Sequence, residues 1–301
     1  MSLTIMTAVA VIAAHDRSGL LDDLNSGLYD RCSPDPLYCT LSGTGVRLLL
    51  DSEALKYLGM LNIGLPAIVG MLWGAPLLGR DLEQGTHRTV LTQGVSRGQW
   101  LASRLGLAAG TTLVLSGFLA GVFAWWWQPA ANQSYGVFWY ETAALNGSGP
   151  RVVAAALFGL AVGTLLGLLV RRVLPAMTLA LLVNGAVILA LEAAHRVRFL
   201  VPPHTYTSAG SSPKPAMGDK WSAGHYGLIT ASGRREDVTN CPYPSSTQLG
   251  ECMDSHGYVA RFYEANPAGD YWTFQWTDTL VLGVLTIILT TATTLLLRRR
   301  V

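Results

Sequence analysis

Long apolar runs dominate the pattern of hydrophobic and polar positions along the chain. Four runs without a charged residue cover positions 58–79, 105–127, 152–170 and 280–297, and a fifth, 173–194, carries only Glu192. A helix needs about 20 apolar residues to cross the hydrocarbon core of a bilayer, and soluble helices rarely reach that length without a charge. The pattern therefore predicts an all-α polytopic membrane protein.

A shorter apolar run, residues 3–14, lies near the beginning of the chain. At about 1.5 Å per residue it is too short to span a bilayer alone. No Lys or Arg precedes it, although a signal peptide usually has a basic first region. We interpret it as a first span that is short or truncated, with a signal peptide as the alternative. The chain is then expected to have about six spans, the last starting near residue 276.

The basic residues predict the orientation of these spans. Segments 80–104, 171–172 and 298–300 together hold nine of the 21 Lys and Arg residues, whereas the other twelve are spread over much more of the chain. Short cytoplasmic loops collect Lys and Arg. We therefore expect a multi-pass plasma-membrane protein whose C-terminus lies in the cytoplasm. With 13% charged residues and a net charge of +2, the composition gives no reason to expect a nucleic-acid partner.

Residues 195–275 are expected to form a small, loop-rich extracytoplasmic subdomain, with a short helix near residues 257–264. All four cysteines lie in the outer loops, namely Cys32, Cys39, Cys241 and Cys252. An even number of external cysteines favours disulfides, and we favour the local pairs Cys32–Cys39 and Cys241–Cys252. A metal site built from all four thiolates is the alternative, but the spacing is not typical of one. No other metal-binding motif occurs in the sequence, so no metal site is expected.

The segment 80–104 has the features of a structured cytoplasmic elbow. Gly85 can end the preceding helix, Thr86 can cap a short helix, and Ser96 and Gln99 have the spacing of a capping box. The pattern predicts a helix–turn–helix that presents acidic and basic groups at the membrane surface. An ordinary solvated loop with good caps is the alternative.

This elbow resembles the cytoplasmic loop of permease subunits in the type-2 class of ABC exporters. The matching residues are Glu83, Gly85, Thr86, Ser96, Arg97 and Trp100, preceded by the stretch from Gly74 to Leu78. The lead-in to the last span, residues 271–276, resembles a subgroup common in high-GC Gram-positive bacteria. The first span departs from the family pattern, because such permeases usually begin with an interfacial helix and a full span.

The resemblance implies that residues 80–104 couple the spans to a separate ATP-binding-cassette ATPase. Arg80, Glu83 and Arg97 would contact that subunit, while Gly85 and Thr86 would shape the turn. ATP and Mg²⁺ would bind in the ATPase, since no Lys of this chain follows a phosphate-binding loop. The chain is therefore not expected to be an enzyme. It would pair with a second permease half, as a homodimer or a heterodimer, within the lipid bilayer.

Polar residues inside the spans are candidates for a substrate path. Asn62, Asn184 and Glu192 lie within or near the ends of predicted spans, where polar groups are costly and often functional. Hydrogen bonding to a neighbouring helix is the alternative role. Gly159, Gly163 and Gly167 share one helix face and predict close helix packing, within the chain or at a dimer seam.

The sequence leaves two functional classes open. The first is the permease of an ABC exporter with an unidentified substrate. The second is a non-transporting sensor, immunity or accessory protein that binds a ligand through its outer loops. The elbow favours the permease, because a sensor needs no capped loop for an ATPase.

Overall fold

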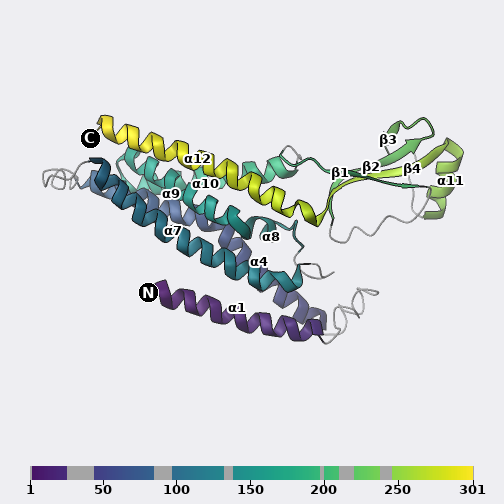
Figure 1. Cartoon of the computed structure of the whole chain (residues 1–301), viewed down its shortest axis with the longest axis horizontal. Helices are drawn as coiled ribbons and strands as arrows, with labels where there is room; N and C mark the ends of the chain where they lie inside the picture. The colour runs from purple at the N-terminus through teal and green to yellow at the C-terminus, as the bar shows by residue number, and fades with distance from the viewer. Residues whose placement is uncertain are drawn as a thin grey trace. The chain divides into compact units, whose positions relative to one another are not determined.

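The structure is a computed structural model that describes residues 2–25, 44–84, 97–131, 138–196, 200–209, 220–237 and 246–300. It divides into two compact units. One contains Met1–Glu192 together with Gln275–Val301, and the other contains Ala193–Phe274. The first is a bundle of long helices and the second is built on a small β-sheet, so the predicted all-α polytopic membrane fold is confirmed with a sheet in its second unit (Figure 1).

The bundle consists of long helices with short ones between them. The long helices are α1 (Ser2–Asn25), α4 (Thr44–Val69), α7 (Arg97–Trp127), α9 (Gly149–Val170), α10 (Val173–Arg196) and α12 (Tyr271–Arg300). The short ones are a π-helical turn (Gly70–Gly74), α5 (Ala75–Glu83) and α8 (Thr142–Gly147). Among the described residues, five segments are long and apolar enough to cross a membrane: Glu53–Glu83, Ala102–Trp127, Gly149–Val170, Val173–His195 and Ala268–Leu297.

Helix α1 is longer than the apolar run that predicted it. It continues past residue 14 to Asn25, which makes 24 residues, or about 36 Å of helix. Its second half packs against the end of α7, where the Arg17 guanidinium lies 4.5 Å from the centre of the Trp125 ring. The Arg17 Nε also donates a hydrogen bond to the Trp125 carbonyl at 3.2 Å. The polar residues that ended the predicted span therefore belong to the same helix.

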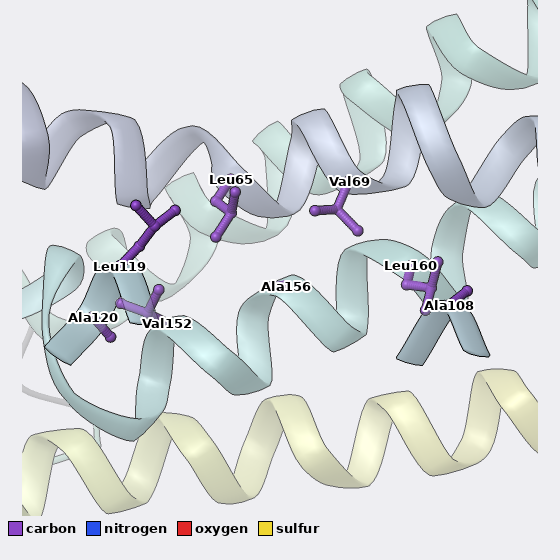
Figure 2. Close-up of a cluster of buried hydrophobic side chains, with 8 residues drawn as sticks. All are labelled: Leu65, Val69, Ala108, Leu119, Ala120, Val152, Ala156 and Leu160. Carbon is purple, nitrogen blue, oxygen red and sulfur yellow. The ribbon is translucent and has the colours of Figure 1, made fainter. Parts of the chain in front are cut away.

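Helix α9 lies at the centre of the bundle and packs against α4, α5 and α7. Figure 2 shows Leu119 and Ala120 of α7 beside Val152, and Ala108 of α7 beside Leu160, so α7 and α9 run antiparallel. In a bilayer, lipid tails are as apolar as these side chains. Packing the side chains between helices therefore removes little apolar surface from water. Close packing, rather than removal from water, is therefore expected to hold the helices together.

At the seam between α9 and the α4–α5 segment, glycines of one helix lie directly against the backbone of the other. A Cβ atom on Gly159 would lie 2.0 Å from the Pro66 carbonyl oxygen, and one on Gly163 would lie 2.1 Å from that of Gly70. The opposite side is also glycine, since a Cβ on Gly74 would lie 2.7 Å from the Leu160 carbonyl oxygen. The predicted small-residue face of α9 is thus a packing face, and it is used within the chain. The two segments run parallel along it.

The π-helical turn lies in this seam, four residues after Pro66. A proline has no amide hydrogen for the helical ladder, and π turns occur mostly as single insertions inside α-helices. The turn carries Gly70 and Gly74 onto the glycine face of α9.

The second unit is a four-stranded antiparallel sheet with strand order β1-β4-β2-β3. Its elements are β1 (His204–Ala209), β2 (Trp221–Thr230), β3 (Arg235–Asp237), α11 (Ser246–His256) and β4 (Tyr258–Asn266). The loop-rich expectation missed this sheet, and the short helix expected near residues 257–264 is wrong. That stretch pairs with β1 and β2 on its two sides, and its β-branched and aromatic residues suit a central strand.

Gly257 separates α11 from β4. Its φ is 70°, the left-handed conformation in which glycine commonly follows the end of a helix. Leu228 of the sheet, Met253 of α11 and Tyr258 form the small buried core beneath that helix.

Candidate functional site

A buried ion pair joins two spans of the bundle. The Arg151 Nε of α9 lies 2.5 Å from the Asp278 Oδ2 of α12, and the two side chains are 5% and 0% exposed. Arg151 stands in the first turn of α9, where the positive end of the helix dipole disfavours a cation. Asp278 offsets that effect, and the pair ties the first turn of α9 to α12.

A second carboxylate belongs to the same cluster. Glu192 of α10 accepts a hydrogen bond from the Asn146 Nδ2 of α8 at 3.0 Å, and its charge also acts on Arg151. The Gln275 Nε2 of α12 donates to the Leu145 carbonyl of α8 at 2.7 Å and is fully buried. We call Arg151, Asp278, Asn146, Glu192 and Gln275 the polar cluster. It connects α8, α9, α10 and α12.

Asn62 and Asn184 lie beside this cluster and are 1% exposed each. The Asn62 Nδ2 donates to the Gly147 carbonyl of α8 at 2.7 Å. The Asn184 Nδ2 donates to the Ala180 carbonyl of its own helix at 2.8 Å. Both residues line a small cavity that Asn146 and Arg151 also reach. The structure therefore brings these two predicted path residues close to Glu192, the third.

Sequence reasoning missed the two charged residues that make the ion pair. Arg151 directly precedes the run 152–170, and Asp278 lies two positions before the run 280–297, inside the span expected to start near residue 276. Both residues lie outside the uncharged runs, so neither was considered among the polar residues of the spans. The available signal was their position within one turn of an apolar run, on two segments that the alternation of spans places at the same side of the membrane.

A short aromatic turn leads into α8. The Phe138 amide lies 3.4 Å from the Glu141 Oε1, which accepts its hydrogen bond, and Trp139 is 3% exposed. Burial, and then the neighbouring Glu141 charge, raise the pKa of Tyr140 above its ordinary value. The phenol therefore stays neutral across the physiological pH range, so its partial burial in this turn does not bury a charge.

At the other end of the bundle, residues at both ends of the predicted elbow contact neighbouring spans. Asp81 of α5 forms an ion pair with Arg104 of α7 at 3.1 Å. The Glu83 Oε2 accepts a hydrogen bond at 3.0 Å from the backbone amide of Val173, the first residue of α10. A carboxylate at a helix N-terminus satisfies an open amide and complements the helix dipole.

An apolar cluster completes this end. Leu78 of α5, Trp100 of α7, Leu168 of α9 and Leu297 of α12 pack together and are all buried. Helices α9 and α10 are joined here by only two residues, of which Arg171 has a φ of 55° and closes α9. Five helix ends thus meet beside the described parts of the elbow, residues 80–84 and 97–104.

The predicted elbow residues themselves are only partly described. Arg80 is exposed in α5, and Glu83 is exposed while it binds Val173. Arg97 begins α7, whereas Gly85 and Thr86 lie outside the described residues. Their assignment to ATPase coupling stays a prediction.

The same holds for the predicted disulfides. Cys32, Cys39 and Cys241 lie outside the described residues. Cys252 lies in α11, with its Sγ 3.5 Å from the His256 Nδ1. Within the described part of the chain, no group of three or more His, Cys, Asp or Glu side chains is placed to hold a metal ion.

Comparison with known families agrees with this architecture. The model of the family described as ABC-2 membrane transporter related matches residues 3–196, which is well over half of the 301-residue chain. The chain belongs to this family. No curated protein and no solved structure matches it.

Membership of the ABC-2 membrane transporter related family gives the chain a permease role in an ABC transporter. Such a subunit lies in the membrane and works with an ATPase. The matched residues include α1, the glycine seam and the elbow, together with Arg151 and Glu192. They do not include the sheet unit or α12, so Asp278 lies outside the part of the chain that the family model describes.

Proposed function

We propose that this protein is the permease subunit of an ABC exporter, powered by a separate ATPase that binds ATP and Mg²⁺. A second permease half, identical or similar to this chain, would complete the path across the membrane. The three arginines at 298–300 support a cytoplasmic C-terminus. The observation that supports the coupling role is the meeting of five helix ends beside residues 80–84 and 97–104.

Coupling requires that motion at the elbow reach the spans. Asp81 and Arg104 link α5 to α7, Glu83 links α5 to α10, and the apolar cluster adds α9 and α12. A displacement of residues 80–104 by an ATPase would therefore act on several spans at once. Packed elements of this kind transmit small shifts, because they have a few discrete arrangements rather than a continuous range.

The close packing of the outer half of the bundle explains why transport would need a displacement driven by the ATPase. The cavity lined by Asn62, Asn146 and Asn184 measures about 20 Å³, far below the roughly 300–1,000 Å³ of a small-molecule site. A substrate path past Asn62, Asn184 and Glu192 would require the helices to separate and the polar cluster to rearrange.

We predict that Glu83→Lys and Arg97→Glu each weaken ATPase binding by about 30-fold or more, since breaking one side of an interface charge pair costs about 2–5 kcal/mol. Transport should fall in parallel, while membrane insertion persists. The measurement is recovery of the ATPase with the tagged permease in mild detergent, together with transport by the reconstituted pair.

Glu83→Gln separates the two roles of Glu83. Glutamine keeps an acceptor for the Val173 amide but has no charge for the ATPase. Loss of binding in Glu83→Gln as well as in Glu83→Lys supports the docking role, whereas normal binding in Glu83→Gln limits Glu83 to capping α10. Glu251→Lys, on the exposed side of α11, is the matched control and should bind normally. Normal transport in both Glu83→Lys and Arg97→Glu contradicts the coupling proposal.

The disulfides make a separate prediction. Peptide mapping without reductant should recover Cys32 linked to Cys39 and Cys241 linked to Cys252. Each link would stabilise its unit by about 2–3 kcal/mol on the chain-entropy model. Complete alkylation of all four thiols in intact cells would refute both pairs.

A further inference from the structure

We propose that the small cavity between α4, α8, α9, α10 and α12 is a built site for one ordered water molecule, held by the amide oxygens of Asn62, Asn146 and Asn184. The proposal does not depend on the transport function, since it rests only on the buried polar groups of the bundle. The cavity measures about 20 Å³ and is otherwise lined mainly by aliphatic side chains and Phe158.

Three asparagines that line this cavity each have a side-chain acceptor without a donor. Each asparagine uses its amide nitrogen elsewhere: Asn62 on the Gly147 carbonyl, Asn146 on the Glu192 carboxylate and Asn184 on the Ala180 carbonyl. These acceptors fix the orientation of the three amides, because a flipped amide would place two oxygens against each other. The Oδ1 atoms are then left buried, with no hydrogen-bond partner in the described part of the chain.

The guest must therefore donate hydrogen bonds and be small. A buried polar group without a partner is costly, especially inside a membrane. A water molecule needs a cavity of about 10–15 Å³ and two to four polar partners. The site offers about 20 Å³ and three acceptors, so one water can donate to two of the amides at a time.

A metal cation is the other guest that oxygen atoms can bind. The lining includes Arg151, but Asp278 and Glu192 carry the opposite charge beside it, so the charge around the cavity does not decide between the two guests. Cations such as Ca²⁺ and Mg²⁺ take about six or more oxygen ligands in proteins, whereas this cavity offers three amide oxygens. We therefore assign the site to water.

Such a water would extend the polar cluster to α4. Asn62 is on α4, Asn146 on α8 and Asn184 on α10, and the amide nitrogens of the three donate to other groups rather than to one another. One guest would join the three helices in the outer half of the bundle.

The first experiment is an experimental structure of the full chain in lipid nanodiscs, at a resolution that shows ordered water. We expect one density peak within hydrogen-bond distance of at least two of the three Oδ1 atoms. We expect the peak to disappear in Asn184→Leu, which removes an acceptor and fills the space. A cavity without density in the unaltered protein overturns the proposal.

Thermal unfolding tests the same site in solution. Asn184→Leu should change the melting temperature by several degrees more than Thr164→Val, since about 1 kcal/mol corresponds to roughly 2–4 °C for chains of about 150–250 residues. Thr164 is the matched control: it is equally buried and also donates to the carbonyl four residues earlier, but it does not line the cavity. The melting temperature should be the same in sodium, potassium and choline chloride. A sodium-specific increase that Asn184→Leu abolishes would overturn the assignment to water in favour of a cation.

Discussion

Replacing Asp278 with asparagine is expected to destabilise the folded permease by about 3–5 kcal/mol, because the change leaves a buried guanidinium without its counter-charge. Arg151 is only 5% exposed and lies in the first turn of α9. Glu192 is the remaining carboxylate near Arg151, and it would offset only part of the loss. Denaturant unfolding in nanodiscs, followed by tryptophan fluorescence, measures the change in free energy.

Two further variants distinguish the ion pair from a general effect of substitution. The double change Arg151→Met with Asp278→Leu should recover most of the stability, since replacing a whole buried pair with apolar groups is often neutral. Asp81→Asn is the matched control at the partly exposed pair with Arg104, whose side chain is 43% exposed. Pairs of that kind are worth about 0–1 kcal/mol. Equal losses in Asp81→Asn and Asp278→Asn would show that burial of the Arg151–Asp278 pair has no special effect.

The second large effect is expected at the glycine seam. Gly159→Ala places a methyl group 2.0 Å from the Pro66 carbonyl oxygen, so α9 and α4 must move apart. Overpacking by even small groups costs about 1–3 kcal/mol, and this contact is with backbone rather than a flexible side chain. We therefore expect a loss at or above the upper end of that range, measured by the same unfolding assay.

Gly185→Ala is the control for the seam. Gly185 lies in α10, and a Cβ atom there meets nothing within 4 Å. Alanine favours a helix interior over glycine by up to about 1 kcal/mol, so this variant should be as stable as the original protein or more so. If Gly159→Ala is equally well tolerated, the seam is looser than described and the close parallel packing of α4 and α9 is wrong.

Several features of the protein were determined by local sequence alone. Apolar runs of about 20 residues predicted the later spans, because the thickness of a bilayer sets the length of a helix that crosses it. The spacing of Gly159, Gly163 and Gly167 predicted a packing face, because residues four apart share one side of a helix. These signals lie within single segments, so they need no knowledge of neighbours.

Tertiary structure alone decided which segments meet. It paired Arg151 with Asp278, 127 positions apart by their residue numbers, and it chose α4 and α5 as partners of the glycine face. It also placed residues 258–266 between two other strands, which the local pattern had not revealed. Contacts of this kind depend on complementary shape and charge between distant segments. The sequence of a single segment shows that burying an arginine is costly. It does not show which carboxylate, on another helix, offsets that cost.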